Sequence, residues 1–374
     1  MSEPIWFWQN INSPHMAGLA EALAIKGIAV TYVAKEEMTL DRKALGWQAP
    51  EFNKCEFMLA KDIASIAQLV ASAPADSIHV CEGIRGNGLI SHAQTLLARR
   101  KLQQWVIMEM VNDHGWGGII KRAVYRYLFN RDLFRIEGVL ATGNTTPEWL
   151  VDRGVPAARV FPFTYFLPEP AKEQAYHQNP SACFRFIFVG QFIERKRLRL
   201  LIEAISKIRA HDFKLVVVGS GPLEDELHGQ ADKLLGKRLI WLGRLMQSEV
   251  LGEMRKADCL VLPSGFDGWG AVVSESLMVG TPAIVSDRCG SAGVVKASSG
   301  GGVFKTDDLN DLLTKMNEIL TEGRQTIERR HDLIERARCL GAEAGANYLN
   351  DILEYHKLGG TRPSLPWLSG IKDS

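Results

Sequence analysis

The sequence lacks several features that mark common classes of protein. No stretch of its 374 residues approaches the ~18–20 consecutive apolar residues of a membrane span, and the N-terminus has no basic region followed by an apolar run. The net charge is only +1, so no overall field favours nucleic acid as a partner. The six cysteines are scattered without a Cys-x-x-Cys pair, which argues against a disulfide or zinc framework. We therefore expect a cytoplasmic protein without a signal peptide.

Three ligand-binding patterns are also absent. The chain has no P-loop ending in Gly-Lys-Ser/Thr, and no complete Gly-x-Gly-x-x-Gly fingerprint with a downstream acid. It has no Asp-x-Asp pair, which would clamp a divalent cation, so we expect that no metal ion is required. A nucleotide-dependent dehydrogenase is accordingly the weakest of the enzyme classes to consider.

What the sequence does contain is a regular alternation of short β-branched runs with helical patterns. The expected strands are 27–34, 77–83, 104–110 and 138–143 in the first half, and 184–190, 214–221, 239–243, 259–264 and 282–287 in the second. Continuous apolar strands separated by helices indicate parallel sheets covered on both faces. A polar, proline-bearing stretch without periodicity lies between the halves. We predict two α/β domains, residues 1–168 and 183–343, joined by a linker at 169–182.

Two acids surround a glycine-rich turn in "SGFDGWGAVVSESLMVGTPAIVSD", residues 264–287. Asp267 precedes Gly268 and Gly270, and Glu275 follows eight positions after Asp267. Either acid could be a solvated surface residue, and Glu275 could simply stabilise the first turn of a helix. Arg195 and Lys196 are expected at the first turn of another helix, where the dipole opposes cations. A bound anion would satisfy them, although a solvated basic face is the alternative.

The second half resembles the C-terminal domain of the retaining glycosyltransferases of family 4. The resemblance rests on "FVGQFIERKRLRLLIEAI", "LVVVGSGPLEDEL", "WLGRL" and "ADCLVLPSGFDGWGAVVSESLMVGTPAIVSD", in that order. The family signature is an acid, seven residues and a glutamate; Asp267 stands where Glu is usual, and Gln191 where many members have Arg. The first half fits less tightly. The resemblance implies the α/β GT-B fold, with two doubly wound Rossmann-like domains facing a central cleft and residues 344–374 supplying a helix that crosses back to the first domain.

The resemblance also implies roles for residues of the second domain. Glu275 would accept hydrogen bonds from the ribose hydroxyls, and Asp267 would bind a hydroxyl of the transferred sugar. Arg195 and Lys196 would neutralise the departing diphosphate. The donor would further contact residues at the ends of strands and at the glycine-rich turn, namely Gly190, Gln191, Gly219, Ser220, Arg244, Leu245, Gly268, Trp269, Gly270, Ala271 and Val272.

The first domain would supply the acceptor site. Its candidates lie at three turns between strands and helices: Ser13, His15 and Gly18, then Arg85, then Glu109 and His114. His114 is the candidate for a catalytic role, because related enzymes place a histidine or carboxylate of this region near the reacting centre. For either histidine, an ordinary surface or core role is the competing interpretation.

The implied activity is transfer of a hexose from a nucleotide sugar, with retention at the anomeric carbon and without a metal ion. UDP-sugars are the favoured donors and GDP-sugars the second choice. The acceptor would be a saccharide or lipid-linked saccharide, as in the synthesis of cell-surface polysaccharide, lipopolysaccharide or glycolipid. Among enzymes, a GT-B epimerase or phosphorylase is the closer alternative to a glycosyltransferase. The alternative from another class is a non-catalytic protein that binds nucleotide sugars or carbohydrates on the same fold.

One helical stretch, Trp116–Arg135, combines basic residues with aromatic and aliphatic ones. Such a helix can lie in a membrane interface, which would make the protein peripheral on the inner face of the membrane. A helix packed on its own sheet with a solvated basic side fits the same pattern. The sequence gives no indication of the oligomeric state.

Overall fold

The computed structural model describes residues 3–44, 46–85, 87–170, 183–209 and 212–368. Its chain divides into two compact units. The first comprises Met1–Lys43, Gln48–Pro168 and Ala342–Leu365, and the second comprises Ala44–Trp47, Glu169–Gly341 and Pro366–Ser374. Most of the predicted linker, residues 171–182, lies outside the described residues.

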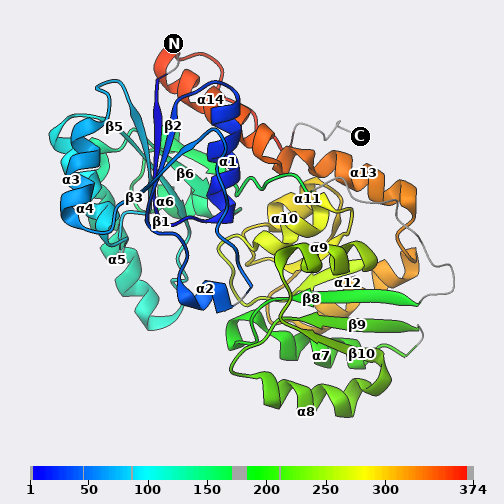
Figure 1. Ribbon diagram of the computed structural model, residues 1–374. Coiled ribbons are helices and arrows are strands. Elements are labelled where there is room, and N and C mark those ends of the chain that lie inside the picture. Colours follow the sequence, from blue (N-terminus) through cyan, green and yellow to red (C-terminus); the bar gives the residue numbers. More distant parts are fainter. Residues whose placement is uncertain (1–2, 45, 86, 171–182, 210–211, 369–374) are drawn as a thin grey trace. The chain divides into compact units, whose positions relative to one another are not determined.

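The first unit is built on a parallel sheet of seven strands in the order β3-β2-β1-β4-β5-β6-β7 (Figure 1). Its elements are β1 Ile5–Ile11, α1 Pro14–Ile25, β2 Val30–Glu36, α2 Leu40–Ala44, β3 Glu56–Leu59, α3 Ile63–Ser72, β4 Ile78–Glu82, α4 Leu89–Arg99, β5 Gln103–Glu109, α5 Gly115–Asp132, η1 Leu133–Arg135, β6 Gly138–Thr142, α6 Thr146–Val151, η2 Ala157–Arg159, β7 Val160–Phe163 and α14 Ala342–Leu358. The strand order reverses at β1, which pairs with β2 on one side and β4 on the other.

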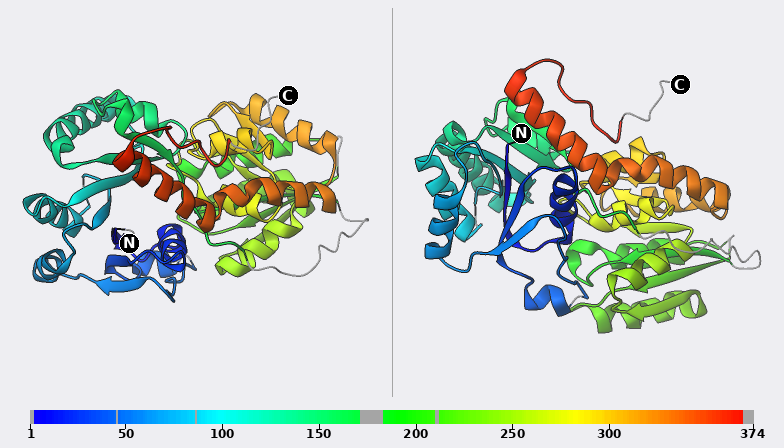
Figure 2. Two further views of the ribbon diagram at one scale, coloured as in Figure 1. Left: turned by 90° about the horizontal axis from the view of Figure 1, so that it is seen from above. Right: turned by 45° about the horizontal axis from the view of Figure 1, so that its top comes forward.

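Helices cover both faces of this sheet. Alternate residues of a strand point to opposite faces: Val106 packs with the buried residues of α5 and α6, whereas the neighbouring Trp105 contacts His356 of α14 edge to face. The helix α14 also packs against α1 (Figure 2). The C-terminal helix is therefore part of the first unit.

The second unit has a parallel sheet of six strands in the order β10-β9-β8-β11-β12-β13. Its elements are β8 Phe184–Val189, η3 Glu194–Lys196, α7 Leu198–Ser206, β9 Phe213–Val218, α8 Glu224–Leu235, η4 Gly236–Arg238, β10 Leu239–Gly243, α9 Gln247–Lys256, β11 Cys259–Leu262, α10 Ala271–Met278, β12 Ala283–Ser286, α11 Ala292–Ala297, β13 Gly301–Phe304, α12 Leu309–Glu322, α13 Ile327–Ala337 and η5 Arg338–Leu340. One core cluster joins α7, α8 and α12 to one face of the sheet, and α9, α10 and α11 cover the other (Figure 1).

In this unit the strand order reverses between β8 and β11, which are neighbours in the sheet. In doubly wound sheets, ligands bind beyond the carboxyl ends of the strands at such a reversal. The segments that follow β8 and β11 are the ones that contain the predicted cations and Asp267. The topology therefore brings together two segments that are far apart in the sequence.

Candidate active site

Asp267 is the centre of a cluster of charges in the second unit. Lys196 donates a hydrogen bond from Nζ to Asp267 Oδ2 over 2.5 Å, and Arg195 Nη1 lies 3.3 Å from Asp267 Oδ1. Ser264 Oγ donates to the same carboxylate over 3.2 Å. The side chains of Lys196 and Asp267 are each only 13% exposed. Two cations and one acid are thus held together at the carboxyl ends of β8 and β11.

The prediction that Arg195 and Lys196 lie in the first turn of a helix is wrong. They belong to the short 3-10 segment η3, and α7 begins only at Leu198. The intervening Arg197 has a left-handed backbone with φ of 53°, a conformation that interrupts an α-helix. The amide of Gly265 donates to the carbonyl of Arg195 over 2.8 Å, and Arg195 Nη1 donates to Phe266 O over 2.8 Å. Loop contacts, rather than a helix terminus, fix the two cations.

The turn between Asp267 and α10 leaves a row of backbone donors available. None of the N–H groups from Gly268 to Val272 donates a hydrogen bond to another described residue. The carbonyls of Asp267 and Trp269, by contrast, accept from the amides of Gly290 and Ser291 over 2.9 Å each. The turn is therefore fixed through its carbonyls while its amides are free to bind an anion or a hydroxyl.

The side chain of Trp269 does not take part in a surface site. It is 2% exposed, and its indole N–H donates to Ser274 Oγ over 3.1 Å. Gly270, the residue before α10, has φ of 82°, which glycine adopts without strain. The turn therefore offers backbone groups only.

Glu275 lies in α10 and is partly buried. Its Oε1 accepts a hydrogen bond from Gln247 Nε2, at the start of α9, over 3.1 Å. Burial raises the pKa of Glu275, and the hydrogen bond from Gln247 opposes that effect. Gln247 is a partner that sequence reasoning missed, because no local pattern connects it to Glu275.

The remaining predicted donor residues lie at the ends of β8, β9 and β10. A Cβ atom on Gly219 would lie 1.9 Å from the carbonyl oxygen of Gly190, so glycine is required there for close packing of two loops. Arg244 donates a hydrogen bond from Nε to Ser220 Oγ, and Leu245 follows directly. Gln191, two residues after the end of β8, is partly buried. Contact between these residues and a nucleotide-sugar donor stays a prediction.

A cavity of about 270 Å³ lies in the first unit, at the carboxyl ends of β1, β4 and β5. Four of the predicted acceptor-side residues line it: Ser13, His15, Arg85 and Glu109. Gly18 and His114 are not among its lining residues. Gly18 lies inside α1, where a Cβ atom would be 2.9 Å from Pro168 Cδ, and His114 is exposed at the start of α5.

His15 stacks on Tyr165, with ring centroids 5.1 Å apart and an interplanar angle of 17°. Burial, with a smaller contribution from the charge of Arg42, lowers the pKa of His15 to about 4, so the ring is neutral near pH 7. Burial and the neighbouring carboxylate of Glu109, which is also a hydrogen-bond partner, raise the pKa of Tyr165 well above its ordinary value. His15 therefore lines the cavity as an uncharged ring and does not act as a general acid at neutral pH.

Sequence reasoning missed a second carboxylate in this cavity. Glu82, the last residue of β4, lines it, and Glu82 Oε2 accepts from the backbone N and the Nδ2 of Asn10 over 2.9 and 3.1 Å. Glu82 Oε1 makes no hydrogen bond to any of the described residues. An oxygen of this kind can accept a hydroxyl of a ligand.

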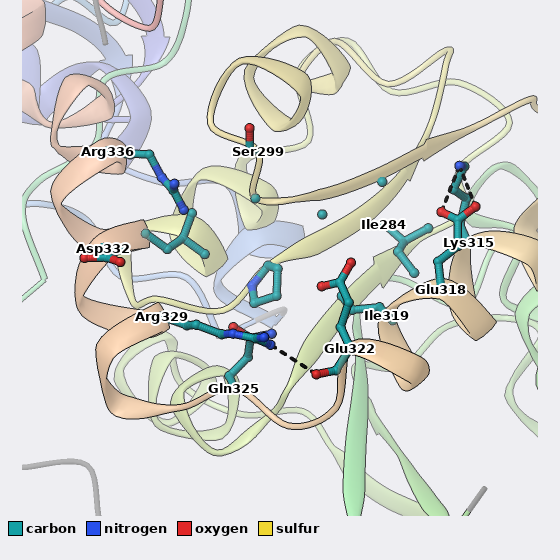
Figure 3. Close-up of a pocket in the computed structure, with 15 residues that line it drawn as sticks. Ile284, Ser299, Lys315, Glu318, Ile319, Glu322, Gln325, Arg329, Asp332 and Arg336 are labelled. Carbon is teal, nitrogen blue, oxygen red and sulfur yellow. Dashed lines mark hydrogen bonds and ion pairs between the residues drawn. The ribbon is translucent and has the colours of Figure 1, made fainter. Parts of the chain in front are cut away.

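Another cavity, of about 400 Å³, lies in the second unit at the amino ends of β12 and β13 (Figure 3). Arg329 and Asp332 of α13 lie across from Glu322 of α12. It contains none of the predicted site residues, and its lining includes the glycine run at the start of β13. Since its charged rim mixes both signs, it does not indicate a particular ligand.

Residues 172–339 match the family model of the glycosyl transferases group 1. The chain is 32% identical over 144 residues to an uncharacterized glycosyltransferase of Methanocaldococcus jannaschii, MJ1178, covering 38% of this chain and 40% of that protein. It is 31% identical over 140 residues to the phosphatidyl-myo-inositol mannosyltransferase of Mycolicibacterium smegmatis, covering 36% of each. These matches span well under half of either relative.

Solved structures match over nearly the whole chain at low identity. The apo form of the lipopolysaccharide outer core galactosyltransferase WaaB has a TM-score of 0.69 at 15% identity, covering 96% of this chain and 100% of that one. Alr3699/HepE of Anabaena in complex with UDP has a TM-score of 0.71 at 14% identity, covering 94% and 99%. The predicted α/β GT-B fold is confirmed, and residues 172–339 form a glycosyl transferases group 1 domain.

Among the described residues, no group of three or more His, Cys, Asp and Glu side chains is placed to hold a metal ion. No helix in the described ranges has the length and apolarity to cross a membrane.

Proposed function

We propose that this chain is a retaining glycosyltransferase that moves a hexose from a nucleotide sugar to a saccharide or lipid-linked saccharide. The observation that carries the proposal is the group around Asp267. Two cations, Lys196 and Arg195, contact one carboxylate, and the turn that follows it has five consecutive backbone N–H groups available. Fixed cations and oriented amides stabilise the negative charge that develops on a departing diphosphate.

The favoured donor is a UDP-sugar, because the solved structure of Alr3699/HepE holds UDP on the same fold; a GDP-sugar is the second choice. Glu275 would accept hydrogen bonds from the ribose diol in its ionised form. Asp267 would accept one from the transferred sugar, and Lys196 and Arg195 would interact with the diphosphate.

In the proposed reaction, the bond between the anomeric carbon and the diphosphate oxygen breaks as the acceptor oxygen bonds to the same face of that carbon. The proton of the acceptor hydroxyl passes to the departing phosphate oxygen, and the product is a nucleoside diphosphate. The protein positions the two substrates and stabilises the leaving group. This sequence of steps uses no metal ion.

The acceptor site would be the cavity of the first unit, whose lining includes Glu82, Glu109 and Tyr165; these side chains would contact its hydroxyl groups. Acceptors of this chemistry belong to the synthesis of polysaccharide, lipopolysaccharide or glycolipid. If the acceptor is attached to a lipid, the protein acts in the cytoplasm at the inner face of a membrane.

A panel of UDP- and GDP-sugars tests the proposal, with thermal stabilisation and release of nucleoside diphosphate as the readouts. We expect one class of donor to stabilise the protein and to release its nucleoside diphosphate when saccharide acceptors are added. Stabilisation without release by any pairing of donor and acceptor would favour the non-catalytic binding protein. A protein that responds to no nucleotide sugar would contradict both.

A further inference from the structure

The helix α5 has two opposite faces of different composition. At 100° per residue, its buried residues fall on one side, and they are Gly118, Tyr125, Phe129 and Asp132. The opposite side is apolar and exposed to solvent: Trp116 is 88% exposed, Ile120 68% and Tyr127 63%. Ile119, 53% exposed, lies at the edge of this side. We call Trp116, Ile119, Ile120 and Tyr127 the outer stripe.

The outer stripe cannot be explained by packing on the sheet. One interpretation of the sequence was a helix whose apolar residues all pack on the sheet. The positions that face the sheet are instead occupied by the buried residues named above, Gly118, Tyr125, Phe129 and Asp132. Single exposed apolar side chains are common, whereas a contiguous exposed apolar patch marks an interaction surface. Phe134, in η1 directly after the helix, is also exposed, at 82%.

The segment that contains the outer stripe has a strongly positive charge. Residues 115–135 contain five cations, Lys121, Arg122, Arg126, Arg131 and Arg135, and a single acid, Asp132, although the whole chain has a net charge of only +1. Asp132 is paired with Arg131 and Arg135, and Lys121 and Arg122 donate to backbone carbonyls before the helix. Arg126 is exposed and makes no interaction with the described residues.

We propose that the outer stripe docks on an anionic lipid bilayer, with α5 lying in the plane of the interface. Exposed aromatic and aliphatic side chains flanked by cations suit a surface that is apolar below and negative above. A second copy of this chain would bring the same cations together, so it fits the charge less well. Tyr and Trp favour the boundary between headgroups and acyl chains because each has an apolar ring and a polar atom.

This docking surface deepens the proposed function, because α5 also contributes to the candidate acceptor cavity. Tyr125, on the buried face of the helix, lines that cavity, as does Val111 in the loop before it. An α-helix with its side chains is only about 10–12 Å across. A saccharide could therefore enter the cavity while its lipid remains in the bilayer on which α5 lies. The membrane contact itself does not depend on the chemistry of transfer.

Co-sedimentation with vesicles tests the proposal, using phosphatidylcholine alone or mixed with phosphatidylglycerol, without donor or acceptor. We expect binding to the anionic vesicles at low salt and much weaker binding to phosphatidylcholine alone. Since each cation near an anionic surface contributes roughly fivefold in affinity, Arg126→Glu should weaken binding about tenfold or more. The control Arg199→Glu changes an exposed arginine of the second unit and should have no such effect.

The apolar contribution needs a separate pair of variants. Trp116→Ser combined with Ile120→Ser should abolish the binding that remains at moderate salt, whereas Ile63→Ser, at an exposed isoleucine of α3, should not. Brominated lipids should quench part of the tryptophan fluorescence of the unchanged protein, and Trp116→Phe should remove that part while vesicle binding persists.

Three outcomes would overturn the docking proposal. The first is that the protein does not bind anionic vesicles at low salt. The second is that the Trp116→Ser and Ile120→Ser substitutions leave vesicle binding unchanged. The third is self-association of the protein that Trp116→Ser abolishes, which would show that a second copy occupies the outer stripe. Transfer to a water-soluble acceptor without vesicle binding would contradict the docking alone. Vesicle binding by a protein that releases no nucleoside diphosphate would leave the docking intact and contradict the proposed function.

Discussion

Lys196 Nζ and Asp267 Oδ2 lie 2.5 Å apart, although the two residues are separated by 71 positions in the sequence. The cation proposed to face the diphosphate is therefore held by the acid proposed to face the sugar. Each side chain is only 13% exposed. Displacing either one would therefore leave the other charge largely buried without this partner. A cation preoriented in this way stabilises a leaving group without reorganisation during the reaction.

Replacing Lys196 by Ala should lower kcat more than it lowers the affinity for free uridine. The lost charge-assisted interaction is worth about 1.5–3 kcal/mol, which corresponds to a fall in turnover of roughly 10- to 100-fold. Steady-state kinetics with the best donor of the panel, together with calorimetry of uridine, gives both quantities. Arg199→Ala, which removes an exposed cation paired with Glu226, is the control. Unchanged turnover in the Lys196 variant would make it a structural residue.

The affinity for a UDP-hexose should depend on pH through Glu275. Because burial raises its pKa, the free protein protonates Glu275 at a higher pH than an ordinary carboxyl. Donor affinity should therefore fall as the pH is lowered through this raised pKa, since only the carboxylate accepts both ribose hydrogen bonds. Glu275→Gln should bind more weakly, by about 10- to 100-fold for 1.5–3 kcal/mol, and should lose the pH dependence. A variant with the unchanged pH profile would contradict the ribose role.

The raised pKa of Glu275 also affects the free energy of unfolding. Here the effect of pH is opposite to its effect on donor affinity, because stability falls as the pH rises. A carboxyl whose folded pKa is raised favours the folded state when it is protonated. Its contribution is present below the unfolded pKa and is lost as the pH rises through the folded pKa. The difference in unfolding free energy between Glu275→Gln and the unchanged protein should accordingly grow in favour of the variant as the pH increases over that range. Urea unfolding at several pH values measures it.

Most of the fold could be predicted from the sequence because parallel strands are buried on both faces and read as apolar runs. The predicted strand 184–190 corresponds to β8, and 282–287 to β12. The strand β13, Gly301–Phe304, was not predicted, because its first two residues are glycines without β-propensity. It becomes a strand only by pairing with β12, in which Ala283 lies opposite Gly301.

A candidate site could be proposed from the sequence where its residues lie in one short segment, as around Asp267. It was not predictable where partners come from distant elements. Glu82 lies at the end of β4 without a motif of its own, and Tyr165 meets His15 only after the first unit has folded. The start of α7 was misjudged because the left-handed conformation of Arg197 has no signal in the sequence. Such features follow from tertiary contacts rather than from spacing.

Glu82→Gln should raise the acceptor KM about tenfold, the cost of one weakened hydrogen bond of about 1.4 kcal/mol to a charged group. Because Glu82 lines the cavity of the first unit and the proposed donor residues belong to the second, donor affinity and kcat should change little. The glutamine oxygen can still accept from the backbone amide of Asn10, so the local structure should persist. Initial rates at varied acceptor concentration measure the effect, and Glu51→Gln, at an exposed position, is the control. An unchanged acceptor KM would exclude Glu82 from the site.

Gly270→Ala and Gly229→Ala form a matched pair that tests the turn before α10. At Gly270, φ is 82°, and a Cβ atom would lie 2.8 Å from Cys289 Sγ and 3.0 Å from Leu262 Cδ2. Alanine there should reduce the unfolding free energy by about 1–3 kcal/mol and displace the free amides, weakening the binding of UDP. Gly229 lies inside α8 with nothing within 4 Å of such a Cβ atom, so alanine should increase stability by about 0.5–1 kcal/mol and leave UDP binding unchanged. Urea unfolding and calorimetry of UDP measure both effects. If Gly270→Ala binds UDP as tightly as the unchanged protein does, the amides of this turn do not contact the donor.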